Sequence, residues 1–333
     1  MSENPINVLY IFPMSRLEEE CVRQIESVSP RIKVHDASRF AVAEDKGDYS
    51  SKEQFDAILA EAEVLFAFRP PQDVIARAPG LKWIQTPITG ADPVLIPEVV
   101  ESSVIVTNAR GIHGTQGSEM VFAQMLMLAK KASLLLEMKQ EKAWKNFVPE
   151  LLNGKTLGCL GLGAIGVEIV RLAKAFGMRV VATRAHPEVP CEYADEILPS
   201  SRINEVLAQS DFVVVAMPLT PESEKLIGEA QLRAMKPGAY LINISRGKIL
   251  DEDDLIRALK EKWIAGAALD TFTVEPLPVE SELWDLPNVI LSPHIMGRRS
   301  DYNMLATNLF SENLKHYVNG TQMFNVVDKK RGY

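Results

Sequence analysis

The chain has 333 residues, of which 47% are hydrophobic, so it can bury a large core and is long enough for two domains. Its 36 Lys and Arg stand against 44 Asp and Glu, a net charge of -8, which argues against binding to nucleic acid or to an anionic membrane. Small metabolites are therefore the expected partners.

The cysteines and the amino terminus indicate a cytoplasmic protein. Cys21, Cys159 and Cys191 are far apart and lack C-x-x-C spacing, so neither a disulfide framework nor a metal site is expected. The opening "MSENPINVLYIFP" has no basic segment before its short apolar run, and no stretch reaches the ~20 apolar residues of a membrane span. We expect a protein that is neither exported nor anchored.

Short β-branched segments alternate with helical patterns along the chain, which is typical of βαβ units with parallel sheets. The segments fall into two groups. The first group predicts strands at 6–12, 31–37, 64–68, 81–87 and 104–109. The second predicts strands at 156–161, 179–184, 211–218, 239–245, 264–270 and 288–293.

Residues 113–144 lie between the two groups and are apolar over several turns, which predicts one helix that links two domains. Its methionines are expected to be packing or dimer contacts rather than metal ligands: Met120, Met125, Met127 and Met138. A homodimer built through the second domain is predicted, because exposed apolar surface usually marks an interface.

The stretch "GLGAIG" follows an apolar strand and opens the helix "AIGVEIVRLAKAF". Gly161 allows a tight turn, Gly163 allows close approach of a pyrophosphate, and Gly166 lets the helix lie against the strand. Ala164 and Ile165 begin the helix, whose free N–H groups and dipole favour an anion. The pattern predicts a dinucleotide site; the competing interpretation is a plain strand-to-helix turn.

The next strand, "RVVATR", ends with Arg184 where an acid would accept hydrogen bonds from the ribose 2′-OH of NAD. Arginine at this place is typical of sites for the 2′-phosphate of NADP, and Thr183 can add a hydroxyl donor. His186 offers a second cation. We predict that NADPH is preferred and that NAD is possible; the alternative is that Arg184 points to solvent and either cofactor is accepted.

Arg246, Glu275 and His294 each lie just beyond a predicted buried strand, at the sheet edge where ligands bind. Separately they fit a surface charge, a capping acid and a loop histidine. Together they fit the reduction of a 2-keto acid: a guanidinium fork binds the carboxylate, an imidazole exchanges a proton, and a carboxylate fixes the imidazole and favours its charged form. His113, in a glycine-rich loop beside the linker, is the rival acid.

The last apolar periodicity, residues 300–320, predicts a helix that Gly320 ends. It has no following strand to cover, so it is expected to return to the first domain. We predict two Rossmann-like or flavodoxin-like α/β domains, with a dinucleotide domain at 106–296 inserted into a substrate domain at 1–105 and 297–333. The apolar positions of this helix include Leu305, Leu309, Leu314 and Val318.

In "GLGAIG", "LINISRGKILDEDDL", "ALDTFTVEPL" and "LPNVILSPHIMG" the chain resembles a D-2-hydroxyacid dehydrogenase over nearly its whole length. The resemblance implies Arg246 as substrate anchor, His294 as acid/base and Glu275 as its partner. It also implies that Asp270 contacts the nicotinamide amide and that Pro218 borders the cofactor.

The same resemblance implies a substrate-carboxylate loop at "PITGAD", through Thr89, Gly90 and Ala91, and an opposite wall at "AFRPPQD", through Phe68 and Arg69. The expected activity is hydride transfer between NAD(P)H and a small 2-keto acid such as glyoxylate or hydroxypyruvate. Loop shape and not motif decides which acid fits. A formate or phosphite dehydrogenase of the same family and a nucleotide-sensing corepressor or scaffold stay open as alternatives.

Overall fold

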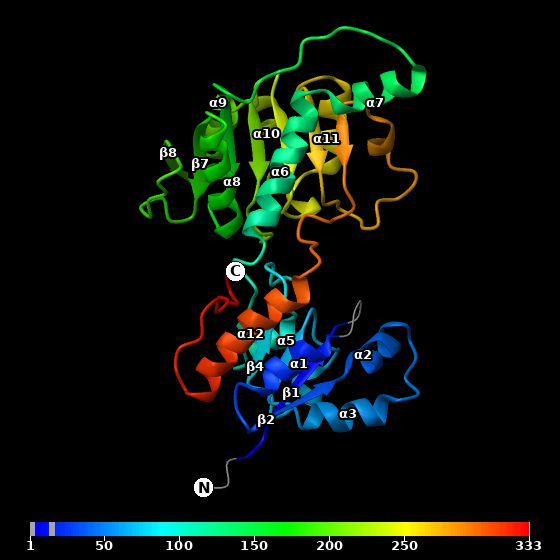
Figure 1. Cartoon of the computed structure of the whole chain (residues 1–333), viewed down its shortest axis with the longest axis vertical. Coiled ribbons are helices and arrows are strands. Elements are labelled where there is room, and N and C mark those ends of the chain that lie inside the picture. The colour runs from blue at the N-terminus through cyan, green and yellow to red at the C-terminus, as the bar shows by residue number, and fades with distance from the viewer. Residues whose placement is uncertain (1–3, 13–16, 333) are drawn as a thin grey trace. The chain divides into compact units, whose positions relative to one another are not determined.

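The computed structural model describes residues 4–12 and 17–332, and the chain forms two compact units. Unit 1 is Met1–Ile112 with Arg299–Tyr333, and unit 2 is His113–Arg298. Each unit is built on a sheet of parallel strands with helices on both faces (Figure 1). The predicted α/β class with two parallel sheets is confirmed.

The sheet of unit 1 has the strand order β2-β1-β3-β4-β5. This is the flavodoxin-like order, which reverses direction between β1 and β3. Neighbouring strands pair in parallel, and β1 and β3 are buried almost throughout. The strands are β1 (Ile6–Ile11), β2 (Ile32–Asp36), β3 (Val64–Ala67), β4 (Trp83–Gln85) and β5 (Ile105–Thr107).

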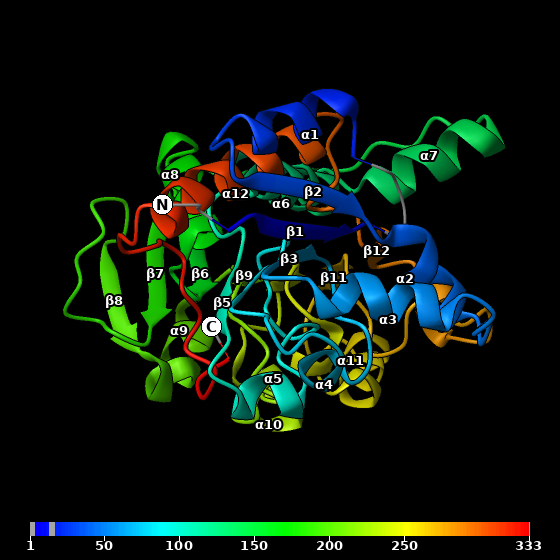
Figure 2. The same ribbon diagram turned by 90° about the horizontal axis from the view of Figure 1, so that it is seen from below.

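Helices cover both faces of this sheet (Figure 2). On one face, α1 (Glu19–Glu26) and α12 (Tyr302–Val318) bury Ile25, Phe310 and Leu314 against the strands. Gly320 follows α12 with a φ of +64°, a conformation that glycine adopts without steric cost. The other face carries α2 (Ser38–Asp45), α3 (Lys52–Ala60), α4 (Val74–Arg77) and α5 (Pro97–Glu101).

The sheet of unit 2 has the order β12-β11-β10-β9-β6-β7-β8, which reverses direction between β6 and β9. The pattern of apolar residues missed β8, because three of the four positions in this edge strand, "EILP", are only half-buried and it lacks a β-branched run. The strands are β6 (Thr156–Leu160), β7 (Arg179–Arg184), β8 (Glu196–Pro199), β9 (Phe212–Val215), β10 (Tyr240–Asn243), β11 (Gly266–Leu269) and β12 (Val289–Leu291).

In unit 2, α6 (Gly114–Ala129) and α8 (Ala164–Ala175) pack on one face of the sheet. The other face carries α9 (Ile203–Gln209), α10 (Glu229–Ala234) and α11 (Glu252–Lys260). Short 3-10 turns are η1 (Ser200–Arg202), η2 (Gly247–Ile249) and η3 (Glu282–Asp285). Across residues 4–12 and 17–332, no helix combines the length and the hydropathy needed to span a bilayer.

The prediction of one continuous helix over 113–144 is wrong. The helix stops at Ala129, and α7 (Ala132–Glu141) begins after Lys131, whose φ of +54° lies in the left-handed region that an α-helix cannot include. α7 buries none of its residues and extends away from the sheet of its unit (Figure 1). Of the methionines, Met125 is in the core and Met127 is exposed.

Candidate active site

The predicted site residues of unit 2 follow the carboxyl ends of its strands. Because these strands are parallel, their carboxyl ends meet at one edge of the sheet, and the strand order reverses at that edge between β6 and β9. This edge is where open α/β sheets bind ligands. Along it lie Gly161 after β6, Arg184 at the end of β7, Pro218 after β9, Arg246 after β10, Asp270 after β11 and His294 after β12.

The three glycines of "GLGAIG" occupy three different environments. Gly161 has a φ of +110°, and a methyl group on it would lie 2.8 Å from the Ala216 carbonyl oxygen. A methyl group on Gly166 would lie 2.1 Å from the Gly161 carbonyl oxygen, so no larger residue fits there. A methyl group on Gly163 would meet nothing within 4 Å. The loop is closed against protein at two glycines and open at the third.

The amino terminus of α8 faces the open side of this loop. α8 begins at Ala164, Gly163 is its N-cap, and no side chain caps it. The N–H of Val167 donates to the Gly163 carbonyl at 2.9 Å, so the N–H groups of Ala164, Ile165 and Gly166 precede the helical ladder. These residues fit a pyrophosphate, because they combine backbone donors, the positive end of a helix dipole and space above Gly163.

Arg184 ends β7 beside this loop, and its Nη1 donates to the Val189 carbonyl at 3.1 Å. Nδ1 of His186 lies 3.2 Å from Oε1 of Glu188, so an acid accompanies the second predicted cation. Thr183 is only 1% exposed, which differs from the predicted hydroxyl contact with a phosphate. Its carbonyl instead accepts from the N–H groups of Gly161 and Leu162, both at 3.2 Å.

The turn that carries Arg246 lies directly on the segment that leads to Glu275. A methyl group on Gly247 would lie 1.9 Å from the carbonyl carbon of Phe272, so the close approach of the two segments requires glycine. Nδ2 of Asn243 donates to the Arg246 carbonyl at 3.0 Å, and Nη1 of Arg246 donates to the Ser245 carbonyl at 3.1 Å. Arg246 is half-buried at the strand edge.

Glu275 and His294 form a direct pair at this edge. Oε2 of Glu275 lies 2.7 Å from Nδ1 of His294, and Oε1 accepts from the Phe272 N–H at 2.9 Å. The side chains are 36% and 45% exposed, so a small molecule can reach them within unit 2. A carboxylate in this position fixes the imidazole ring and leaves its Nε2 to meet a reactant.

Asp270 is fully buried and binds the segment around His294. Its Oδ1 accepts from Ser292 Oγ at 2.5 Å and from the Ile295 N–H at 3.0 Å, and its Oδ2 accepts from the Met296 N–H at 2.9 Å. Sequence reasoning missed Ser292, and its only sequence signal is its place two residues before the histidine. The contact of Asp270 with the nicotinamide amide stays a prediction.

The predicted substrate residues of unit 1 also lie at a carboxyl edge, with Phe68 and Arg69 after β3 and residues 89–91 after β4. The Phe68 ring stacks on Tyr302 with centroids 6.3 Å apart, and Tyr302 Oη donates to the Pro87 carbonyl at 2.8 Å. Tyr302 therefore joins the two predicted segments. Burial raises its pKa, so the hydroxyl stays a donor. Arg69 forms an ion pair with Asp45.

His113, the rival histidine, lies at the start of α6 and is 6% exposed. A methyl group on Gly297 would lie 3.1 Å from its ring, so His113 packs against the segment that follows His294. His113 is therefore enclosed, whereas the side chains of Glu275 and His294 are accessible to solvent. This burial favours a packing role for His113 and leaves His294 as the stronger candidate for proton exchange.

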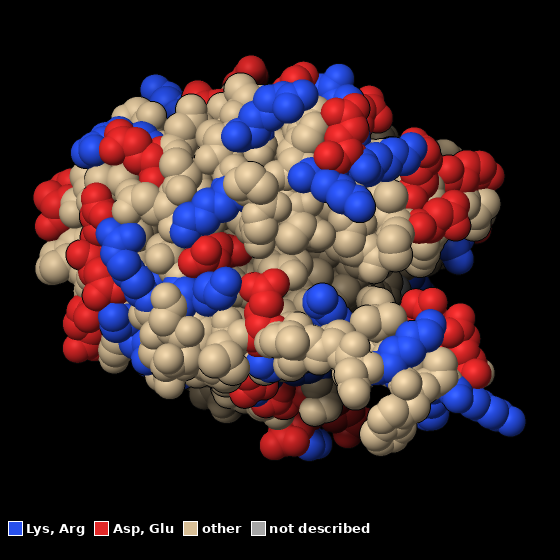
Figure 3. All heavy atoms as spheres, turned by 90° about the horizontal axis from the view of Figure 1, so that it is seen from above, with Lys and Arg blue, Asp and Glu red and all other residues tan. Residues whose placement is uncertain are grey.

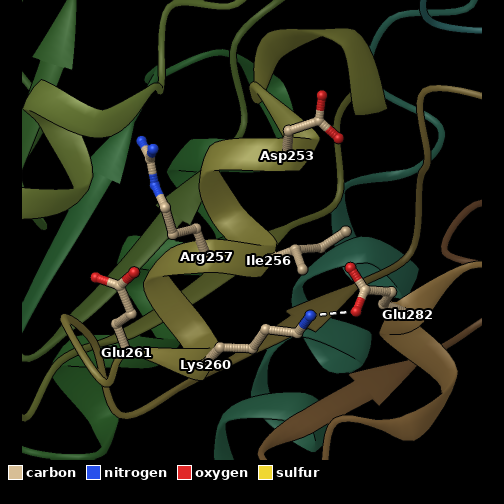
Figure 4. A pocket seen from close by; sticks show the side chains of 6 residues that line it. All are labelled: Asp253, Ile256, Arg257, Lys260, Glu261 and Glu282. Atoms are coloured by element: carbon tan, nitrogen blue, oxygen red, sulfur yellow. Dashed lines mark hydrogen bonds and ion pairs between the residues drawn. The ribbon is translucent and has the colours of Figure 1, made fainter.

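Two other surfaces of the molecule carry weaker indications of a binding site. A cavity of about 280 Å³ lies on α11 and η3, where Lys260 forms an ion pair with Glu282 and Arg257 and Asp253 line the wall (Figure 4). Its lining contains none of the predicted site residues. Cationic and anionic side chains are interspersed over the face drawn in Figure 3, so no field of a single sign covers that face.

Comparisons with known proteins show the family of this chain. The family model described as "D-isomer specific 2-hydroxyacid dehydrogenase, NAD binding domain" matches residues 122–296. A glyoxylate reductase of Thermococcus gammatolerans is 36% identical over 269 residues, which cover 78% of this chain and 79% of that protein.

Two solved structures share the fold over nearly the whole chain. A D-isomer specific 2-hydroxyacid dehydrogenase of Xanthobacter autotrophicus, in complex with NADPH and MES, is 27% identical with a TM-score of 0.84 and covers 99% of this chain and 100% of its own. An NADPH-dependent glyoxylate/hydroxypyruvate reductase of Sinorhizobium meliloti, with NADP and sulfate, is 25% identical with a TM-score of 0.82 and the same coverage. The chain belongs to the D-isomer specific 2-hydroxyacid dehydrogenase family, the oxidoreductases that interconvert 2-keto and 2-hydroxy acids with a nicotinamide dinucleotide, as its motifs predict.

Proposed function

We propose that this protein is an NADPH-dependent reductase of a small 2-keto acid, with glyoxylate or hydroxypyruvate as substrate. The observation that carries the proposal is the pair of Glu275 and His294, 2.7 Å apart, at the same strand edge as Arg246 and the glycine loop. The names of the similar proteins from Thermococcus gammatolerans and Sinorhizobium meliloti support this substrate class.

In this proposal each of the three side chains has one task. Arg246 binds the substrate carboxylate and polarises the keto oxygen with its planar fork. The bound nicotinamide supplies the hydride that the keto carbon accepts. His294 donates the Nε2 proton to the keto oxygen, which becomes a hydroxyl, and is left as a neutral imidazole. Glu275 accepts a hydrogen bond from Nδ1–H and keeps the ring oriented. In the oxidation direction, the hydroxyl proton of the substrate returns to Nε2 of His294.

The preference for NADPH rests on Arg184. It occupies the end of β7, where NAD-specific sites carry an acid, and the residue is half-buried. A 2′-phosphate there gains a charge-assisted hydrogen bond. Glu188 is bound to His186, and its negative charge opposes a contact between His186 and the phosphate. Arg184 therefore carries the preference for NADPH alone.

The two units have separate roles in this proposal. Unit 2 is the dinucleotide domain, and it binds the cofactor through the glycine loop, Arg184, Pro218 and Asp270. Unit 1 is the substrate domain. It contributes Phe68, Arg69 and the backbone of residues 89–91, where Asn108 Nδ2 already fixes the Thr89 carbonyl at 2.8 Å. The three cysteines are free thiols, which fits a reducing cytoplasm.

We also infer a homodimer that forms through the apolar arm, residues 132–151. Large apolar side chains are exposed along this arm although a monomer gains nothing from exposing them. Leu136 is 60% exposed, Trp144 is 95% exposed and Val148 is 86% exposed. A second copy of the chain is the occupant that removes this surface from water.

The activity is tested with the purified protein, a panel of 2-keto acids, and NADPH or NADH, by the loss of reduced-cofactor absorbance. We expect the highest kcat/KM with glyoxylate or hydroxypyruvate and NADPH. Oxidation of formate or phosphite with no reduction of any keto acid assigns the protein to that branch of the family. Cofactor binding without turnover of any substrate supports the sensor or scaffold role.

A further inference from the structure

The histidine loop, residues 292–297, holds His294 in a backbone conformation that needs support. His294 has a φ of +50°, in the left-handed region that residues with a side chain rarely adopt. Such a conformation persists where the surroundings fix it from several sides, and it recurs at functional sites. The contacts of this loop therefore decide where the imidazole stands.

Asp270 fixes the loop from the sheet side. Its carboxylate accepts hydrogen bonds from Ser292 Oγ and from the N–H groups of Ile295 and Met296, at 2.5 to 3.0 Å. Residues on both sides of His294 are thus bound to one buried carboxylate. Because a carboxylate only accepts, the Ser292 hydroxyl hydrogen points to Asp270, and the Ser292 oxygen is left to accept from another donor.

Helix α6 supplies that donor. Nε2 of Gln124 donates to Ser292 Oγ at 3.1 Å. Two more contacts of the loop fall on the same helix: a methyl group on Gly117 would lie 2.8 Å from Met296 Sδ, and one on Gly297 would lie 3.1 Å from the His113 ring. Residues 113, 117 and 124 share one face of a helix with 3.6 residues per turn.

Gln124 is a poor residue for this place if stability alone matters. It is 1% exposed within the apolar segment "VFAQMLMLA", and its Oε1 has no hydrogen-bond partner among the residues that the structure describes. A buried amide with an unsatisfied oxygen is less favourable than a leucine of similar volume. The amide makes a hydrogen bond to Ser292, which a leucine could not make.

We propose that Gln124 is a positioning residue, which acts through Ser292 and Asp270 to fix His294 for proton transfer. The inference rests on the proposed function, because it gives Gln124 a part in the acid/base step. When the N–H donor of Gln124 is lost, Ser292 and its loop shift. The distance between His294 and Glu275 then changes, and so does the alignment of His294 Nε2 with the substrate. Displacements of about 1 Å can cost about 10²-fold in rate.

The main variant is Gln124→Leu, which keeps the volume and removes both the donor and the unpaired oxygen. We expect kcat to fall by about 10-fold to 10²-fold, with a melting temperature that is unchanged or higher and an NADPH dissociation constant close to that of the wild type. The alkaline limb of the pH–rate profile for reduction should move to lower pH. Ser292→Ala should act in the same direction and more strongly, since it also removes a bond to Asp270.

Ser118→Ala is the matched control, because Ser118 carries a buried hydroxyl on the same helix and donates it to the Thr115 carbonyl of that helix, at 2.9 Å. It should keep the wild-type kcat and pH profile. In the His294→Ala background, Gln124→Leu should cause no further loss if it acts through the imidazole. Wild-type kcat and pH profile in Gln124→Leu, or an equal loss without the histidine, would overturn the proposal.

A readout independent of turnover separates this proposal from the proposed function. In protein labelled with ¹⁵N-histidine, the ring signals of His294, identified by their loss in His294→Ala, should shift in Gln124→Leu and not in Ser118→Ala. If no keto acid is reduced yet these signals shift, the proposed function fails, and what stands is that Gln124 fixes the position of the His294 ring. Unchanged His294 signals in Gln124→Leu overturn the positioning role.

Discussion

Nδ1 of His294 and Oε2 of Glu275 lie 2.7 Å apart, although 19 positions of sequence separate them. The distance is that of a hydrogen bond, and it joins the segments that follow two neighbouring strands, β11 and β12. With Nδ1 engaged, Nε2 is the ring nitrogen left to meet a reactant. Each residue of this pair can therefore be tested by its own variant.

Replacement of His294 by alanine should remove the proton donor and leave the cofactor site intact. We expect kcat for keto-acid reduction to fall by about 10²-fold to 10⁴-fold, while NADPH binding, followed by fluorescence titration, changes little. His316→Ala, at a half-buried histidine near the end of α12 in unit 1, is the control. Near-normal turnover in the His294 variant would rule out the assignment and return attention to His113.

Glu275→Gln should alter the pH dependence more than the maximal rate. Reduction needs a protonated imidazole, and a neutral amide no longer favours the charged ring, so the active range should narrow toward lower pH. The measurement is kcat/KM for reduction as a function of pH. Glu280→Gln, at an exposed acid of the same segment, should keep the wild-type profile. A uniform loss at every pH would point to a structural role for Glu275.

Arg246→Lys should weaken both KM and kcat, because lysine keeps the charge but loses the bidentate fork that binds substrate and transition state. Arg246→Ala should be worse. Initial rates over a range of keto-acid concentrations test this, with Lys248→Ala, two residues away and exposed, as the control. Unchanged kinetics would mean that the carboxylate is bound elsewhere, with Arg69 or Arg298 next in line.

Arg184→Asp should reverse or abolish the preference for NADPH, since it replaces the phosphate partner by an acid suited to the ribose 2′-OH. The comparison is kcat/KM with NADPH and with NADH, and the preference of the wild type should weaken as salt is added. Lys315→Asp makes the same charge change in unit 1. Equal values, or a preference for NADH, in the wild type would show that Arg184 does not bind the 2′-phosphate.

Light scattering at micromolar concentration should give twice the mass of the chain. Leu136→Asp and Trp144→Asp should shift the mass toward that of a monomer, because each places a charge on the apolar arm. Val279→Asp is the control, since Val279 is 84% exposed elsewhere in unit 2. A monomeric wild type would leave α7 without the partner that the homodimer proposal requires.

Sequence patterns predicted much of the fold because their signals are local. Runs of β-branched residues marked the buried strands, and the glycines of "GLGAIG" marked a turn that their lack of side chains makes possible. The parallel order of strands then placed Arg246, Glu275 and His294 at one edge before any contact was known. Local signals failed at β8, which is mostly half-buried and lacks an apolar run, and at Lys131, where one backbone conformation ends a helix that apolar periodicity continues.

By itself the sequence determined the fold class, the family and the residue types at the strand ends. Tertiary structure alone decided which side chains meet. Thr183 is enclosed, Tyr302 joins two segments of unit 1, and Gln124 reaches Ser292 across 168 residues. These contacts depend on how helices pack on a sheet, and no window of neighbouring residues encodes that packing. In the sequence, Gln124 is only a polar residue within an apolar helix. The three-dimensional structure shows that its amide binds the Ser292 hydroxyl.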